Sequence, residues 1–340
     1  MGWKIVFFSQ GYGKDHLKRD LLISKRLIRK DDRIEVKFAS YGEGYKAAIG
    51  EGLQCVNLGL DIHDRIARIE KLLCEEKPDL VVTDEELIAL PLSKARKIPS
   101  LLITNWLPPH PNHPAVKYFA DADGIILAHL KECFHLPFNL KTSLHFVGPL
   151  FHPLKRGAEE KTSAGKAKLA IVLPRLSHDS LDFLRNLLEM ARKLDGGIHW
   201  LVLAGEFKEE LKREYEEGSF EFRNHLWGLD QYLLSSSFVV TSPRFFILWQ
   251  LAELGIPSMC VLHPNSEYLV QHLFLVNCIK EIGYVLPLFE GEDRGKIKES
   301  LEFLVSYRTH SEGVKIQRRQ SERRAAEIIV SFLKEGVNAK

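Results

Sequence analysis

A histidine near the N-terminus stands where it could act as a base. It ends the segment SQGYGKDH, residues 9–16, in which an apolar run gives way to two glycines and then to a helical pattern. Glycines permit a tight turn, and the N-terminus of a helix presents free N–H groups with partial positive charge. His16 in this place could remove a proton from a hydroxyl group. The structural alternative is a surface histidine on an ordinary strand-to-helix turn, and this stretch alone favours that alternative.

Other candidate chemistries fit the sequence less well. The chain has 14 histidines, and His110, His113 and His263 lie in or beside predicted loops. No H-E-x-x-H motif or histidine–carboxylate cluster accompanies them, so we expect loop histidines and no metal site. Residues 177–179 are Ser-His-Asp, but adjacent residues cannot point at one another as a hydrolase triad requires.

The composition indicates a folded protein of two domains. A chain of 340 residues is too long for one ordinary core, and 45% hydrophobic and 27% charged residues are normal for globular proteins. A net charge of +2 does not favour a nucleic-acid partner. The five cysteines form no C-x-x-C pair, which argues against a zinc knuckle or a disulfide framework. The pattern contains no signal peptide or membrane span, so we expect a cytoplasmic protein.

Short apolar runs alternate with helical patterns through both halves of the chain. This alternation is typical of parallel sheets covered by helices. Residues 155–168 interrupt it with Lys, Glu, Gly, Ser and Ala, and it restarts at Leu169. We therefore expect an α/β protein with two Rossmann-like domains facing a cleft. Open sheets of this kind bind ligands just beyond the carboxyl ends of their strands.

The individual elements follow from the apolar runs. In the first half, strands are predicted at 3–9, 34–40, 80–83, 100–104, 124–128 and 144–147, with a helix after the first strand. In the second half, strands are predicted at 169–173, 199–203, 238–241 and 258–262, and helices at 181–194, 245–254, 267–282 and 317–334. The expected divisions are an N-terminal domain at 1–150, a linker at 151–168, a C-terminal domain at 169–316 and a terminal helix at 317–340.

The segment around His16 resembles the N-terminal signature of a large glycosyltransferase group, G-x-G-x-G-H-x-x-R followed by Asp or Ser. Gly11, Gly13, His16, Arg19 and Asp20 match this signature, and an aspartate replaces its third glycine. The group has the GT-B fold and includes the bacterial N-acetylglucosaminyltransferase that makes the peptidoglycan lipid precursor.

Weaker similarity covers most of the chain in the same order. Residues 36–42 resemble the second strand and its turn, and residues 79–84 and 98–105 resemble the paired strands D-L-V-I-S-D and I-P-x-I-x-I-x-N of the group. Residues 147–150 resemble its interdomain hinge, and residues 251–257 resemble the helix-to-strand turn of its donor domain. The resemblance implies that the terminal helix packs back toward the first domain.

The resemblance also implies an activity. It is the transfer of a sugar from a nucleotide-diphosphate sugar, as co-substrate, to a hydroxyl acceptor, with inversion and without a metal or other cofactor. His16 would remove the acceptor proton. The acceptor side would include Gly11, Gly13, Arg19, Asn105, Trp106 and His110.

The donor side departs from the pattern of the group. Two glycine-rich turns that bind the diphosphate are replaced, by PRLSHD at 174–179 and by SPRFFILWQ at 242–250. Side chains on former glycines block the close approach of the backbone to a phosphate. Arg175 and Arg244 could clamp the diphosphate instead, or they could be solvated loop arginines, and the sequence favours neither.

Three further residues belong to the expected donor side. Gln250 replaces a glutamate that holds the ribose hydroxyls in the group, and a neutral amide loses the stronger charge-assisted hydrogen bond. Glu267 and Gln271 stand where the group carries an acidic–amide pair beside the donor sugar. The two lost glycine turns support an alternative function, a catalytically degenerate GT-B relative that binds a ligand or regulates a partner. Sugar-nucleotide epimerases share the fold, but no residue selects that activity.

The predicted first helix is rich in basic residues around an apolar stripe. Such a stretch is typical of an ordinary helix that packs on a sheet with a solvated basic face, and this is the interpretation we favour. The alternative is a peripheral contact with anionic lipid at the inner membrane face.

Overall fold

A computed structural model describes residues 2–154, 168–174, 178–194, 197–215, 219–224, 229–282, 285–307 and 318–338. The chain divides into two compact units. The first unit combines Met1–His152 with Gln317–Lys340, and the second is Pro153–Ile316. Arg175 and most of the expected linker lie outside the described residues.

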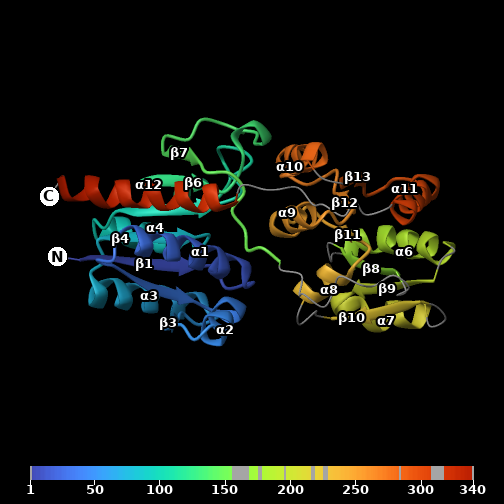
Figure 1. The fold of residues 1–340 in the computed structure, drawn as a ribbon, viewed down its shortest axis with the longest axis horizontal. Coiled ribbons are helices and arrows are strands. Elements are labelled where there is room, and N and C mark those ends of the chain that lie inside the picture. Colours follow the sequence, from blue (N-terminus) through green and yellow to red (C-terminus); the bar gives the residue numbers. More distant parts are fainter. Residues whose placement is uncertain are drawn as a thin grey trace. The chain divides into compact units, whose positions relative to one another are not determined.

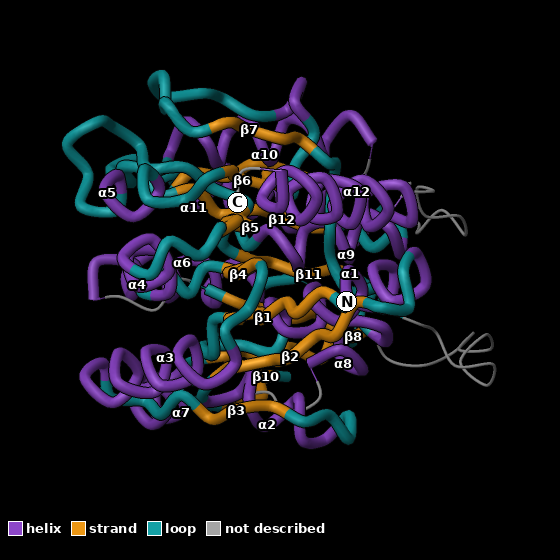
Figure 2. The backbone as a smooth tube through the Cα atoms, turned by 90° about the vertical axis from the view of Figure 1, so that its left-hand side faces the viewer, coloured by secondary structure: helices purple, strands orange, loops and turns teal. Residues whose placement is uncertain are grey.

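The first unit contains a parallel sheet with strand order β3-β2-β1-β4-β5-β6-β7. Figure 2 shows this row of strands from β3 to β7. The strands are β1 Trp3–Ser9, β2 Ile34–Ser40, β3 Cys55–Asn57, β4 Leu80–Asp84, β5 Ser100–Thr104, β6 Gly124–Leu127 and β7 Ser143–Phe146.

The central strands are buried along their whole length, which explains the apolar runs in their sequences. Every residue of β4, β5 and β6 is buried. Strands apolar on both faces require helices on both faces of the sheet. The chain runs from β1 to β2 on one side and later returns to β4 on the other side of β1. This reversal between β1 and β4 opens the sheet at its carboxyl edge, where ligands of such folds bind.

Helices cover the first sheet. They are α1 Asp15–Lys30, α2 Gly42–Gly50, α3 Ile62–Glu76, α4 Ala89–Ala95, α5 Val116–Phe119, the 3-10 turn η1 Lys131–Cys133 and the C-terminal α12 Arg318–Asn338. Although α12 comes last in the chain, it lies beside α1 (Figure 1). Its contact with the sheet is close, because a Cβ atom on Gly124 would stand 2.6 Å from the ring of Phe332.

The basic residues of α1 are partly neutralised by α12. Arg26 Nε donates to Glu322 at 2.9 Å, and Lys30 Nζ lies 3.5 Å from a carboxylate oxygen of Glu327. These pairs favour an ordinary helix packed on the sheet. None of the helices in the described part of the chain combines the length and apolar character needed to cross a bilayer.

The second unit repeats the plan with strand order β10-β9-β8-β11-β12-β13, all parallel. Its strands are β8 Lys168–Leu173, β9 Ile198–Leu203, β10 Phe220–Arg223, β11 Phe238–Thr241, β12 Ser258–Leu262 and β13 Val285–Phe289. Its helices are α6 His178–Arg192, α7 Lys208–Glu214, α8 Leu229–Ser235, α9 Phe245–Leu254, α10 Leu269–Ile282 and α11 Arg294–Ser306, with a 3-10 turn η3 at Gly205–Phe207. Here the reversal lies between β8 and β11.

The expected α/β class with two parallel sheets is confirmed. The strands β3, β10 and β13 were not among those expected from the sequence. Cys55, Cys74 and Cys260 are free thiols, whereas Cys278 is disulfide-bonded. The sequence argued against a disulfide framework, but scattered cysteines carry no sign of which thiols the fold brings together.

The packing of α12 can be tested with a matched pair of variants. Ile329 is completely buried, whereas its neighbour Ile328 is half-buried. Ile329→Ala leaves a cavity and should lower the free energy of unfolding of the first unit by about 2–5 kcal/mol. Ile328→Ala should have a clearly smaller effect. Thermal and urea denaturation followed by circular dichroism measure the difference, and equal effects would contradict this packing.

Candidate functional site

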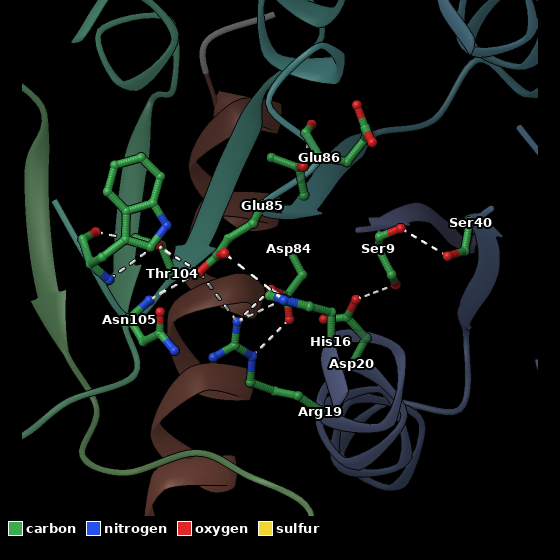
Figure 3. A network of polar contacts seen from close by, with 12 residues as sticks. Ser9, His16, Arg19, Asp20, Ser40, Asp84, Glu85, Glu86, Thr104 and Asn105 are labelled. Atoms are coloured by element: carbon green, nitrogen blue, oxygen red, sulfur yellow. Dashed lines mark hydrogen bonds and ion pairs between the residues drawn. The ribbon is translucent and has the colours of Figure 1, made fainter. Parts of the chain in front are cut away.

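A run of three acidic residues follows the buried strand β4 at the carboxyl edge of the first sheet. Asp84 ends the strand, and Glu85 and Glu86 begin the loop after it. The strand lies beside β1, at the reversal of the sheet. The first turn of α1, which carries His16, meets the same edge (Figure 3). The acidic residues and His16 therefore occupy the position where this fold binds ligands.

Asp84 is the centre of a buried hydrogen-bond network (Figure 3). The Arg19 guanidinium bonds both of its carboxylate oxygens, through Nε to Oδ2 at 2.7 Å and through Nη2 to Oδ1. His16 Nδ1 lies 2.7 Å from Oδ1. A carboxylate can only accept, so Nδ1 carries the proton and Nε2 is left to accept one when the ring is neutral. His16 and Arg19 reach Asp84 together because residues three apart share one face of a helix.

Asp20 extends the network beneath α1. Its Oδ2 accepts a 2.5 Å hydrogen bond from Ser9 Oγ, and Ser40 Oγ donates to the carbonyl of Ser9 at 2.9 Å. Asp20 and both serines are buried. The network thus ties α1 to the ends of β1 and β2 as well as to β4.

Glu85 is aimed into the site by an unusual backbone conformation. Its φ angle is +59°, in the left-handed region that non-glycine residues rarely adopt, and it forms a bridge to Ser9. Its Oε1 accepts hydrogen bonds from Thr104 Oγ1 at 3.0 Å and from the backbone N–H of Asn105 at 3.4 Å. Its Oε2 lies 3.9 Å from His16 Nε2. Backbone strain of this kind often marks a functional residue.

The network shifts the pKa values of its members in opposite directions. Burial alone would raise the pKa of Asp84, but Arg19 and His16 lower it to about 2. Burial alone would lower the pKa of His16, but the carboxylates of Asp84 and Glu85 outweigh it and raise the pKa above 6.5. Burial, and then the charge of Asp84, hold the pKa of Asp20 well above its ordinary value. Asp84 is therefore the ionised carboxylate that Arg19 and His16 face.

These shifts also determine how the site contributes to stability. Because the pKa of His16 is raised on folding, its contribution is complete below pH 6.5 and is lost as the pH rises through the raised value. Because the pKa of Asp84 is lowered, its contribution is complete above pH 3.8 and is lost as the pH falls toward 2.

One group of potential metal ligands occurs in the described part of the chain. Ligand atoms of His16, Asp84 and Glu85 lie within 4.8 Å of one another. Arg19, however, already bonds both Asp84 oxygens and lies 4.0 Å from Glu85 Oε1. A guanidinium at these distances repels a second cation, so the charge distribution disfavours a metal.

Glu86 belongs to a separate cluster. Arg65 stacks over the ring of Tyr41 at 4.2 Å, and its Nη1 lies 4.0 Å from Glu86 Oε2. Burial raises the pKa of Glu86 and raises that of Tyr41 to about 12. Adjacent acidic residues thus join different networks, Glu85 with His16 and Glu86 with Arg65.

The residues expected on the acceptor side have different environments. A Cβ atom on Gly11 would stand 2.1 Å from the Tyr41 carbonyl oxygen, so this glycine is required for packing, whereas Gly13 faces open space. Arg19 is completely buried, and its guanidinium bonds Asp84. Asn105 follows β5 and contacts Glu85 through its backbone.

Trp106 and His110 lie farther along the same loop. The indole of Trp106 packs edge to face on Phe119, with ring centroids 5.1 Å apart, and is half-buried. His110 is exposed and its ring packs against His113, with centroids 5.7 Å apart. Their contact with an acceptor stays a prediction.

The residues expected on the donor side lie in the second unit, apart from Arg175, which is outside the described residues. Arg244 immediately precedes α9, where its Nε donates to Ser242 Oγ at 3.3 Å and its Nη2 to the carbonyl of Pro174 at 3.5 Å. It is exposed and bridges the ends of β8 and β11 at the reversal of the second sheet. Its position suits a phosphate contact, because the N–H groups of α9 begin beside it.

The remaining donor-side residues lie on or near α9 and α10. Gln250 of α9 is only 4% exposed, so it offers little surface to a ribose in this conformation. Glu267 is exposed just before α10, and Gln271 is half-buried within it. Their roles toward a donor stay predictions.

Asp84 and Glu85 were not among the site residues expected from the sequence. Residues 79–84 were recognised only as a strand, although two acidic residues directly after a buried strand of a parallel sheet are themselves a signal. Asp20 was recognised as a signature residue without a role. The network among them depends on contacts across 68 and 65 positions of sequence, which no local pattern contains.

No protein-family model and no curated protein sequence matches this chain. Solved structures match over nearly its whole length. The glycotransferase of kitacinnamycin is 17% identical, with a TM-score of 0.67 over 98% of this chain and 100% of the other. MurG of Acinetobacter baumannii is 10% identical, with a TM-score of 0.58 over 98% and 99% of the two chains. The UDP-GlcNAc 2-epimerase of Neisseria meningitidis, bound to UDP-GlcNAc, is 14% identical, with a TM-score of 0.69 over 98% and 100%. These likenesses confirm the expected GT-B fold.

The electrostatics of the site can be tested by titrating His16. In protein labelled with carbon-13 at histidine, the His16 signal, assigned with His16→Gln, should titrate above pH 6.5. Glu85→Gln removes a neighbouring negative charge and should lower this pKa. Glu86→Gln, the same change one residue along the chain, should leave it near the wild-type value. An unchanged pKa in Glu85→Gln would contradict the observed orientation of Glu85.

Proposed function

We propose that this protein transfers a sugar from a nucleotide-diphosphate sugar to a hydroxyl group of an acceptor, with inversion and without a metal. The proposal depends most on one observation, the 2.7 Å contact between His16 Nδ1 and an Asp84 carboxylate that Arg19 holds in place. This contact leaves Nε2 as the proton acceptor of a general base. The GT-B fold, which glycosyltransferases share, supports the same activity.

In the proposed reaction, neutral His16 accepts the acceptor proton on Nε2. The acceptor oxygen attacks the anomeric carbon of the donor sugar from the face opposite the diphosphate. The bond between that carbon and the diphosphate oxygen breaks, and the diphosphate leaves with the electron pair. Asp84 stabilises the imidazolium that forms, and Arg19 and Ser9, the latter through Asp20, hold the network rigid.

The donor diphosphate is assigned to the carboxyl edge of the second sheet. Arg244 stands there at the start of α9, beside backbone N–H groups that carry partial positive charge. In the proposed role its guanidinium gives up the long bond to Pro174, 3.5 Å, for two shorter bonds to phosphate oxygens.

A second candidate function is that of a GT-B relative that binds a ligand without catalysis. The burial of Gln250 and the bulky start of α9, where Phe245 is also buried, favour it. One measurement distinguishes the two candidate functions. Incubation with UDP-GlcNAc and a panel of alcohols, followed by proton NMR, detects a glycoside, the 2-epimer of the sugar nucleotide, or no reaction. Only the first result supports the proposed transfer.

The role of His16 predicts a large kinetic effect with a small structural one. His16→Ala should lower kcat by about 100- to 10,000-fold, the usual contribution of a general base. Measured at a pH above the pKa of His16, where its charge no longer contributes to stability, the melting temperature should change little, because Arg19 still pairs with both Asp84 oxygens. His63→Ala, at an exposed histidine in the first turn of α3, is the control and should retain full activity. Normal turnover by His16→Ala would remove His16 from the mechanism.

The role of Arg244 predicts a loss of nucleotide binding. Calorimetry with uridine, thymidine, guanosine and adenosine diphosphates identifies the base that binds. For that nucleotide, Arg244→Ala should weaken binding by about 1.5–3 kcal/mol, the scale of a hydrogen bond to a charged group. Arg192→Ala, at an exposed arginine of α6, is the control. Tight binding that does not depend on Arg244 would refute this phosphate contact.

The proposed mechanism uses no metal, so removal of metal ions should have no effect on activity. Dialysis against EDTA should leave kcat/KM unchanged, because Arg19 already neutralises the carboxylate that a metal would need. A loss of activity that added Mg²⁺ or Mn²⁺ restores would contradict this part of the proposal.

A further inference from the structure

The Glu85 carboxylate is held firmly by one of its two oxygens. Oε1 accepts from Thr104 Oγ1 and from the N–H of Asn105, at the end of β5. Among the described residues, the only partner of Oε2 is His16 Nε2, at 3.9 Å, which is beyond hydrogen-bonding distance. One oxygen is therefore fixed by the fold, while the other is presented beside the nitrogen of the proposed base.

Packing alone does not explain the conformation of Glu85. Glu85 adopts its left-handed backbone conformation immediately after a buried strand. Its side chain is 10% exposed and that of His16 is 12% exposed, so neither side chain is completely enclosed. An acidic oxygen kept so near the base has to be satisfied by water or by a bound molecule.

We propose that the acceptor is a polyol with hydroxyl groups on two adjacent carbons, one that reacts at His16 and one that donates to Glu85 Oε2. This inference rests on the proposed transfer function and names the class of its acceptor. The reacting hydroxyl has a single proton, which His16 Nε2 accepts. Glu85 therefore needs a second donor, and the 3.9 Å between the two atoms suits the hydroxyl of the next carbon.

The same geometry discriminates against simple alcohols. An alcohol with one hydroxyl would displace water from Glu85 without replacing its hydrogen bond, and a carboxylate oxygen that loses its hydrogen-bond donor in this way is costly. Sites built to bind a substrate hydroxyl reject analogues that lack it more strongly than they reject a change of size. Glu85 is thus a residue that determines specificity, whereas Asp84 orients the base.

A cationic ligand fits the space between Glu85 Oε2 and His16 Nε2 less well than a neutral diol does. Arg19 Nη2 lies 4.0 Å from Glu85 Oε1, and Glu85 helps to raise the pKa of His16. An amine or a metal ion would add a third positive group beside these two, whereas a hydroxyl donates without adding charge.

Three small probes test this inference on the full-length protein without nucleotide. They are trans-1,2-cyclohexanediol, trans-2-methoxycyclohexanol, which cannot donate from its second oxygen, and cyclohexanol. Binding is measured as the shift of the carbon-13 His16 signal at a pH above the pKa of His16. We expect the diol to bind about 10-fold more tightly than either mono-alcohol, because only it forms the charge-assisted bond.

Two variants test whether Glu85 causes the preference for the diol. In Glu85→Gln the diol and the mono-alcohols should bind alike, while Glu86→Gln should keep the wild-type preference. Equal binding of the three probes to the wild type, or a preference that persists in Glu85→Gln, would overturn the inference. Binding of Mn²⁺ at micromolar concentration that depends on Glu85 would also overturn it, because the space would then be a cation site.

The inference and the proposed function can fail separately. A Glu85-dependent preference for the diol, with no glycoside formed from any nucleotide sugar, would retain the diol site and remove the transfer function. Transfer to cyclohexanol as efficient as transfer to the diol would retain the function and remove the diol requirement.

Discussion

The buried ion pair between Arg19 and Asp84 is the interaction on which the rest of the site depends. Both side chains are fully buried, so each charge has lost its hydration and relies on the other. The pair joins the first helix to the fourth strand and fixes the position of that helix over the sheet edge. His16, one turn before Arg19 on the same face, is thereby held at the same carboxylate. Removal of either partner would leave an uncompensated charge in the core, which costs about 3–5 kcal/mol.

Three consecutive acidic residues illustrate how strongly environment determines chemistry. Asp84 faces Arg19 and His16, which lower its pKa to about 2. Glu86, two residues later, is buried beside Tyr41, and burial raises its pKa despite the nearby Arg65. Between them, Glu85 bends through a left-handed conformation that turns its carboxylate toward His16.

The two units share a topology but differ in the polar groups at the carboxyl edges of their sheets. The edge of the first sheet carries a closed network of buried, mutually bonded polar groups. The edge of the second sheet carries an exposed arginine with long hydrogen bonds at the start of an apolar helix. A rigid network suits proton transfer, which needs fixed geometry, whereas an arginine that can exchange partners suits the capture and release of a charged ligand.

The sequence by itself determined the class of fold, because strands buried on both faces contain short apolar runs, such as 80–82 and 259–262, that stand out. It could not reveal β3, which is three residues long and mostly exposed, or β13, an edge strand whose Pro287 resembles a strand breaker. It also placed His16 at the start of a helix, because glycines and the apolar period are local signals. Only the tertiary structure decided what His16 meets. The pairing of α1 with the end of β4 joins residues 68 positions apart, and the direction of Glu85 depends on a backbone angle that no composition encodes.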